Sequence, residues 1–194
     1  MPKSIKLVTR EFSPKETEAV IGVSVTMQRD WRRRGLLPQR KEEGWAKYKL
    51  EDVIEMMVMQ LFSESRYSVK AAQEFAPLAI DPTLFAISKF PGSVDFEGDA
   101  IGKEEQDFYK ARWLRGGRGR YLVIAHDRRA HKPEISQMEN LKYIDEFLAG
   151  CDAIHATIID CQRIAKTIVD RAGLPLVRFE VDEADVAKAQ PRDE

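Results

Sequence analysis

The sequence contains no hydrophobic run long enough to cross a membrane. Its longest apolar runs, such as residues 121–125 (YLVIA), fall far short of the roughly 18 residues that a bilayer requires. The N-terminal segment MPKSIKLVTREF has no secretory apolar region, and two cysteines among 194 residues do not make a disulfide framework. These absences exclude a membrane-spanning protein and a disulfide-rich secreted one, so we expect a cytoplasmic protein.

Motifs for catalysis and metal binding are missing as well. The chain has no HExxH, no GxSxG and no GxGxxG after an expected strand. Its glycine-rich segment Arg115–Arg120 lacks the Lys-Ser/Thr pair of a P-loop, and is either a solvated turn, which we favour, or a contact for a phosphate or an acidic partner. The spacing matches no zinc template for the residues His126, His131, Cys151, His155 and Cys161. We therefore predict no enzymatic activity, no metal and no cofactor.

The formal net charge of −1 hides an uneven distribution. Residues 1–66 hold 13 Lys and Arg against 10 Asp and Glu, whereas residues 67–194 hold 18 against 22. Within the first part, residues 26–49 hold 8 basic against 3 acidic residues. This pattern indicates one localised surface for a polyanion rather than a coat of positive charge.

Two short helices are predicted near the N-terminus. Ser13 is a suitable cap, Pro14 suits the first helical position, Glu16 completes a capping box and Gly22 ends the helix. Ser24 can cap a second helix directly after this turn. Two short helices joined by a tight glycine-containing turn are typical of a helix-turn-helix.

The second predicted helix, Ser24–Arg34, carries four arginines and ends before Gly35. Val25, Met27 and Trp31 are expected to face inward. The residues expected to face outward are Thr26, Gln28, Arg29, Arg32 and Arg33. A basic helix alone is more often a solvated face, so its flanks must decide.

The segments that follow complete a winged unit. Leu36-Leu37-Pro38 is apolar and should close the base of the unit, and residues 39–49 (QRKEEGWAKYK) predict a small hairpin, or wing. A third helix is predicted from apolar residues at i, i+3, i+4, i+7 and i+8. These are Leu50, Val53, Ile54, Met57, Val58, Leu61 and Phe62.

In order and spacing, these features resemble the MerR family of winged helix-turn-helix regulators and the related excisionase-like DNA-binding proteins. The shared features include the Gly-Val-Ser turn, the basic helix, Gly-Leu-Leu-Pro, and Tyr48-x-x-x-Asp52-Val53 at the start of a long apolar helix. The resemblance covers about residues 10–65. It implies that the second helix enters the major groove of double-stranded DNA while the wing lies on the flanking backbone.

Site residues follow from this resemblance and from the chemistry of the side chains. The candidate base-reading residues are Thr26, Gln28, Arg29 and Arg33. The candidate contacts to the DNA backbone are Ser24, Arg32, Arg40, Lys41, Lys47 and Tyr48. Trp31 is favoured as a core residue, whereas Tyr48 is equally suited to the core and to DNA.

The pattern changes after residue 66. Ser68 can cap a short helix from Val69 to about Ala76, and the proline- and glycine-rich segment that follows indicates a domain boundary near residue 80. Strands are predicted at 120–126, 153–159 and 174–181, and helices at 136–148 and 160–172. Asp160 can cap the second of these helices, and Gly173 ends it. We therefore predict an α+β fold. Its parts are a winged helix-turn-helix at 10–78, a linker at 79–102, a small α/β domain at 103–183 and a flexible tail at 184–194.

The sequence thus predicts a bacterial or phage transcription regulator that binds double-stranded DNA as a homodimer. The C-terminal domain would serve self-association or bind a protein partner or a small ligand, with no role for a membrane. One alternative is an excisionase-like architectural factor that bends DNA. Another is an enzyme or partner-binding protein that uses the N-terminal unit as an adaptor.

Overall fold

A computed structural model describes residues 5–37, 47–65, 67–96, 102–104, 106–108, 119–127 and 133–181. The N-terminal half comprises β1 (Ile5–Thr9), β2 (Glu11–Phe12), α1 (Pro14–Ile21), α2 (Val25–Arg33), β3 (Tyr48–Lys49), α3 (Leu50–Glu64), α4 (Val69–Phe75), the 3₁₀ helix η1 (Ala76–Ala79) and α5 (Ile80–Ser88). The C-terminal half comprises β4 (Val94–Phe96), β5 (Tyr121–Asp127), β6 (Glu134–Met138), the 3₁₀ helix η2 (Leu141–Tyr143), α7 (Ile144–Gly150), β7 (Ala153–Asp160), α8 (Cys161–Ala172) and β8 (Val177–Val181). The predicted α+β class is confirmed, with a helix-turn-helix region followed by sheet-containing parts.

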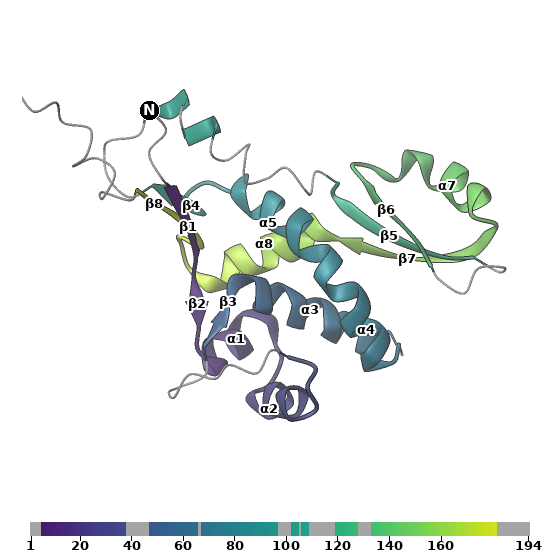
Figure 1. The fold of residues 1–194 in the computed structure, drawn as a ribbon, viewed down its shortest axis with the longest axis horizontal. Helices are drawn as coiled ribbons and strands as arrows, with labels where there is room; N and C mark the ends of the chain where they lie inside the picture. The colour runs from purple at the N-terminus through teal and green to yellow at the C-terminus, as the bar shows by residue number, and fades with distance from the viewer. Residues whose placement is uncertain are drawn as a thin grey trace, which may run out of the picture.

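Three small sheets hold the strands. In the first, β8 lies between β1, to which it is antiparallel, and β4, to which it is parallel. β2 and β3 form a two-stranded antiparallel pair, with Phe12 opposite Tyr48. The third sheet is antiparallel in the order β6-β5-β7. With α7, this third sheet forms a lobe that extends from the helical body (Figure 1).

Helix α3 lies at the centre of the helical body and is buried on more than one side. Five of its seven predicted core residues are buried, but Met57 is only half-buried and Leu61 is 40% exposed. Met56 and Met59, which lie outside the predicted stripe, are completely buried. The prediction was wrong at Leu61 because α3 packs against α1 and β3 and also against α4, η1 and α5, so a single stripe does not describe its core face.

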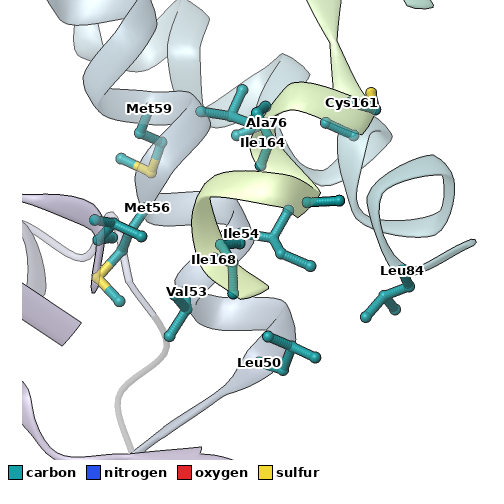
Figure 2. Close-up of a cluster of buried hydrophobic side chains, with 14 of the residues drawn as sticks. Leu50, Val53, Ile54, Met56, Met59, Ala76, Leu84, Cys161, Ile164 and Ile168 are labelled. Atoms are coloured by element: carbon teal, nitrogen blue, oxygen red, sulfur yellow. The ribbon is translucent and has the colours of Figure 1, made fainter. Parts of the chain in front are cut away.

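Helix α8 adds five buried side chains to this core. Its side chains Ile164 and Ile168 point toward those of α3 in Figure 2, and α8 also packs against α1 and α5. The predicted cap at Asp160 and the predicted end at Gly173 are both confirmed, because the Asp160 carboxylate accepts from the Arg163 backbone N–H. One hydrophobic cluster therefore joins residues from both halves of the chain.

The linker predicted at 79–102 is wrong over residues 80–96. This segment contains α5, whose residues Leu84 and Ile87 are buried, and β4, which pairs with β8. Proline does not break α5 because Pro82 lies in its first turn, where a missing N–H costs no helical hydrogen bond. Residues 97–101 of the predicted linker and the predicted tail 184–194 lie outside the described residues.

The predicted C-terminal α/β domain is not one unit. Strands β5 and β7 confirm the predictions at 120–126 and 153–159, but residues 136–138, predicted as helix, belong to β6, and the helix begins only at Ile144. The last strand, β8, does not join β5 and β7 but pairs with β1 from the N-terminus. The sheet-containing region is therefore divided between the lobe and the helical body.

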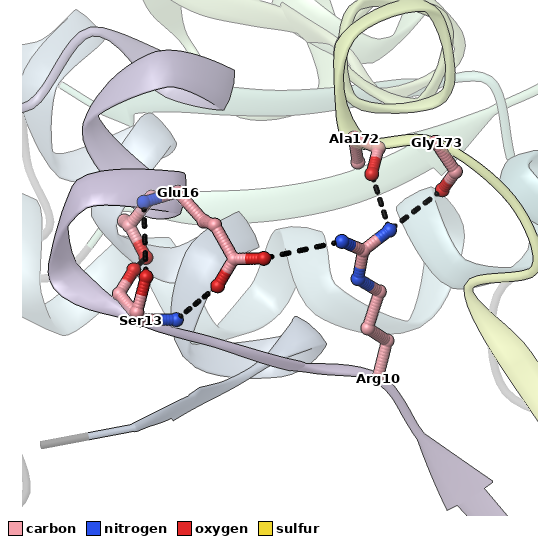
Figure 3. Close-up of polar contacts among 6 residues, drawn as sticks. Arg10, Ser13, Glu16, Ala172 and Gly173 are labelled. Atoms are coloured by element: carbon pink, nitrogen blue, oxygen red, sulfur yellow. Dashed lines mark hydrogen bonds and ion pairs between the residues drawn. The ribbon is translucent and has the colours of Figure 1, made fainter. Parts of the chain in front are cut away.

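Arg10 fastens the start of the helix-turn-helix to the end of α8 (Figure 3). Its guanidinium donates to the carbonyl oxygens of Ala172 and Gly173 and forms an ion pair with Glu16 at 3.3 Å. These carbonyls lie at the C-terminal end of α8, where the helix dipole favours a cation. Within the described parts of the chain, no helix is long and apolar enough to cross a membrane.

Candidate nucleic-acid interface

Local hydrogen bonds that were predicted from the sequence stabilise the ends of the two helices of the helix-turn-helix. Ser13 and Glu16 form the predicted capping box of α1, and Gly22 ends that helix with a left-handed φ of 80°. The Ser24 hydroxyl accepts from the Met27 N–H and so caps α2. The turn between the helices is therefore only three residues long, Gly22 to Ser24, and it fixes α2 against α1.

Two buried side chains seat α2 on the rest of the unit. Trp31 is 3% exposed, which confirms its prediction as a core residue. Gln28, predicted to face outward and read a base, is completely buried, and its amide donates to the carbonyls of Pro14 at 2.9 Å and Val23 at 2.7 Å. The prediction for Gln28 was wrong because two carbonyls inside the unit, one at the start of α1 and one in the turn, need a buried donor.

The prediction for Met27, the residue before Gln28, was wrong in the opposite direction. Met27, predicted to face inward, is 41% exposed. Together the two residues show that the buried face of α2 runs through Gln28 and Trp31, and not through Met27 and Trp31. A prediction from hydrophobicity alone gave the wrong buried face for α2, because the polar, uncharged Gln28 is needed inside.

The exposed surface of α2 is dominated by arginine. Thr26, Arg29 and Arg33 are all exposed, and their i, i+3, i+7 spacing places them on one face. Asp30 forms ion pairs with Arg33 at 2.6 Å and Arg34 at 3.5 Å, which holds these two side chains near one another. A hydrogen bond from Arg33 is the main cause that holds the pKa of Asp30 below its usual range. Desolvation opposes it, and a weaker hydrogen bond from Arg34 adds to it.

No role in the site was predicted for Arg34, although its spacing from Asp30 indicates an ion pair. Asp followed by Arg at i+3 and i+4 is the usual pattern of helical ion pairs. Arg34 remains half-exposed at 52% while paired with Asp30. It therefore adds a fourth cation beside the three arginines of the helix that were predicted to contact DNA.

Arg32 and Tyr48 are brought together from two elements. The Arg32 guanidinium donates to the Tyr48 hydroxyl at 2.5 Å and lies 5.0 Å from the centre of its ring. Tyr48 itself is only 4% exposed. Of its two sequence interpretations the core position is therefore the observed one, and its hydroxyl serves to hold Arg32 rather than to present an open phosphate contact.

Lys47 lies next to the same pair, at the described end of the predicted wing. It is 63% exposed and forms an ion pair with Glu11 at 3.1 Å. The predicted wing residues Arg40 and Lys41 lie outside the described residues. The strand at the end of the wing, β3, pairs with β2, which ties the wing to the residues that precede α1.

The remaining histidines and cysteines lie in the C-terminal half. The rings of His126 and His155 stack with centroids 4.7 Å apart, and Cys161 is completely buried, which raises the pKa of its thiol to about 11. Among the residues with described positions, no three or more His, Cys, Asp or Glu side chains cluster so as to hold a metal ion. His131 and most of the Arg115–Arg120 segment lie outside the described residues.

Comparison with known families supports the arrangement of caps, turn, basic helix and central α3. Residues 12–78 match the family model described as MerR HTH family regulatory protein. The N-terminal third is a MerR-type helix-turn-helix region. No curated protein matches the chain.

The MerR-type region ends within η1, so the match covers the two helices of the helix-turn-helix, β3, α3 and α4. The match indicates a DNA-binding transcription regulator and points away from an enzyme. The elements from α5 onward lie outside the match. They nevertheless complete the hydrophobic core on which the MerR-type region rests.

Proposed function

We propose that this protein is a sequence-specific regulator of transcription that places α2 in the major groove of double-stranded DNA. Thr26, Arg29 and Arg33 read base edges, and Gln28 supports them from beneath. Arg32, Lys47 and the wing residues Arg40 and Lys41 contact the flanking phosphates. Ser24 orients the start of α2 at the DNA surface.

The observation that carries this proposal is the contrast between the two sides of α2. Its inner side is fixed by Trp31 and Gln28, which are 3% and 0% exposed. Its outer side, with the adjoining Arg34, carries four arginines and one aspartate. A rigidly seated helix with a net positive outer face matches both requirements of major-groove recognition, namely a fixed position and donors for guanine and phosphate.

Two copies are needed to read a site of useful length, because one recognition helix covers only a few base pairs. Helix-turn-helix dimers place their helices about one helical turn of DNA apart, or a multiple of it. We therefore expect a site with two related halves. Selection of bound sequences from a random DNA pool by the full-length protein would give the site and its symmetry.

The residue roles are tested by Arg29→Ala. Loss of an arginine that contacts guanine should weaken binding to the selected site about 5- to 150-fold, corresponding to about 1–3 kcal/mol, and relax the preference at one base position. The measurement is binding to the selected site and to single-base variants at several salt concentrations.

A matched control is Arg178→Ala on β8. Like Arg29, Arg178 is exposed. It forms an ion pair with Asp95 at 3.6 Å and belongs to the β1-β8-β4 sheet. Arg178→Ala should leave the affinity for DNA and the base preference unchanged. If Arg29→Ala binds every sequence as the parent does, the proposed position of α2 is wrong.

A further inference from the structure

Strand β7 forms an open edge of the β6-β5-β7 sheet. It is eight residues long, and β5 is its one strand neighbour in the described chain. Alternate N–H and C=O groups of such a strand point away from the sheet and are free to pair with another strand. In Figure 1, β7 runs along the margin of the lobe, on the side opposite β6.

The two edges of this sheet differ in the features that normally prevent pairing. β6 follows Pro133 and begins with the charged Glu134. Between Ala153 and Ile159, β7 has neither proline nor a charged Asp, Glu, Lys or Arg, and it exposes Ile154 by 70% and Ile158 by 41%. Natural edge strands are usually guarded by such residues, so β7 has the properties of a strand that pairs.

A groove of about 420 Å³ lies beside the C-terminal end of this strand. β7 lines it with residues 157–160, α3 contributes Leu61 and Phe62, and α8 contributes Arg163 and Ile164. Leu61 is the residue of α3 that departs from the predicted core stripe, and its 40% exposure is explained by its place in the groove wall. The groove is thus apolar along its wall, and its charged side chains are the basic Arg163 and the acidic Glu64 and Asp160.

We propose that a second copy of this chain occupies this edge and groove, by antiparallel pairing of β7 with β7 about a twofold axis at Ala156. In this register Ala156 faces Ala156 of the second copy, and Ile154 faces its Ile158. The most exposed apolar side chain of the strand then packs beside the groove of the other copy. Both exposed isoleucines are covered at once, and the symmetry closes after two copies.

The same register brings two carboxylates together at each end of the strand pair, and nearby arginines offset their repulsion. One step beyond the isoleucine pairs, Asp152 of each copy lies opposite Asp160. The Asp160 carboxylate is already neutralised by Arg120 at 2.7 Å and caps α8. The neighbouring Arg163, exposed at the groove, is a second cation near these carboxylates.

This inference deepens the proposed function, because it names the surface through which two DNA-binding copies join. Its test uses the full chain without DNA. Failure of the β7 pairing and failure of DNA recognition by α2 are therefore separate outcomes.

The register is tested by Ala156→Cys. Across a pair of antiparallel strands, opposite Cα atoms are about 4.5–5.5 Å apart, which is within the range for a disulfide. Mild oxidation should convert Ala156→Cys to a covalent dimer. Ser136→Cys on β6, another half-buried position of an edge strand, should stay monomeric under denaturing electrophoresis, as should the parent with its native Cys151 and Cys161.

The strength of the contact is tested by Ile154→Lys, with Ile135→Lys on β6 as the control. Ile135 is 42% exposed, so both changes place lysine at an exposed isoleucine of an edge strand. In sedimentation equilibrium, Ile154→Lys should raise the dimer dissociation constant about 10- to 100-fold, since apolar burial is lost on both sides of the axis. Ile135→Lys should dimerise as the parent does.

Three results would overturn the proposal. They are a parent chain that is monomeric up to its solubility limit, a dimer weakened by Ile135→Lys but not by Ile154→Lys, and equal cross-linking of Ala156→Cys and Ser136→Cys. Circular dichroism of each variant verifies that the fold is kept.

Discussion

Helices α2 and α8 share their local design but differ in how they are buried. Each starts at a side-chain cap, Ser24 for α2 and Asp160 for α8, and each carries several basic residues. α2 buries only Gln28 and Trp31. α8 buries five residues, Cys161, Ile164, Ala165, Ile168 and Ala172.

This difference separates the helix that presents a surface from the helix that holds the molecule together. α2 lies at the outside of the helical body, whereas α8 packs against α1 and α5 and joins the C-terminal half to the MerR-type region. Similar caps and similar charge therefore do not reveal a helix's task. The number of side chains that it buries does.

The largest expected effect in this comparison comes from Ile168→Ala in α8. Ile168 is completely buried in the cluster shared by both halves, so its truncation should lower the free energy of unfolding by about 2–5 kcal/mol. Urea unfolding followed by tryptophan fluorescence and by far-UV circular dichroism should shift together. The exposed Gln162→Ala on the same helix should change stability little. Separate transitions for the two probes would contradict a shared core.

A smaller effect is expected from Gln28→Ala in α2. Removing this amide leaves the carbonyls of Pro14 and Val23 without their buried donor, and should cost about 1–3 kcal/mol of unfolding free energy. Met27→Ala, at a 41% exposed position, is the neighbouring control and should cost much less. If Gln28 read a base directly, its loss would instead leave stability unchanged and relax one base position in the selected site.

The smallest effects on stability are expected at the helix caps Asp160 and Ser24, and the two caps differ in how their effects depend on pH. Partial burial alone would raise the pKa of Asp160, but hydrogen bonds from Arg120 and from the Arg163 N–H outweigh it and keep the pKa below the ordinary value of 3.8. The stability that this carboxylate adds is thus complete above the ordinary value and is lost as pH falls through the lower, folded value.

Asp160→Asn keeps a capping side chain and removes the charge, so it should cost less than about 1 kcal/mol at neutral pH. Its deficit relative to the parent should shrink in acid, as measured by urea unfolding from pH 7 to below pH 3.8. Ser24→Ala is the uncharged counterpart in α2 and should cost about 0.5–2 kcal/mol at every pH, because a hydroxyl cap does not titrate. If the loss of unfolding free energy in Asp160→Asn were the same at every pH, the charge of Asp160 would contribute nothing to stability.

The parts of the fold that the sequence predicted correctly are those set by neighbours in the chain. The Ser13–Glu16 capping box, the Ser24 cap and the Asp160 cap each depend on residues three positions apart. The MerR-type region was predicted for the same reason, because its caps, turn and apolar helix follow one another without long insertions.

The errors arose where distant segments decide the outcome. Gln28 is buried because a carbonyl fourteen positions earlier, that of Pro14, needs a donor. The segment 80–96 looked like a linker from its prolines and glycines, but α8 and β8 supply its partners from far along the chain. Periodicity shows which faces of an element are apolar and gives no information on what covers them.

The pairing of β1 with β8 has a consequence for how the protein is made. Ile5 pairs with Val181, so the first strand has no antiparallel partner until residues 177–181 have been synthesised. Helix α8, which packs against α1 and accepts Arg10, is likewise made late. The DNA-binding region therefore leaves the ribosome before the elements that support it. A chain that terminates before residue 177 would carry all the arginines of α2 on an unsupported unit, which couples competence for DNA to completion of the C-terminal strand.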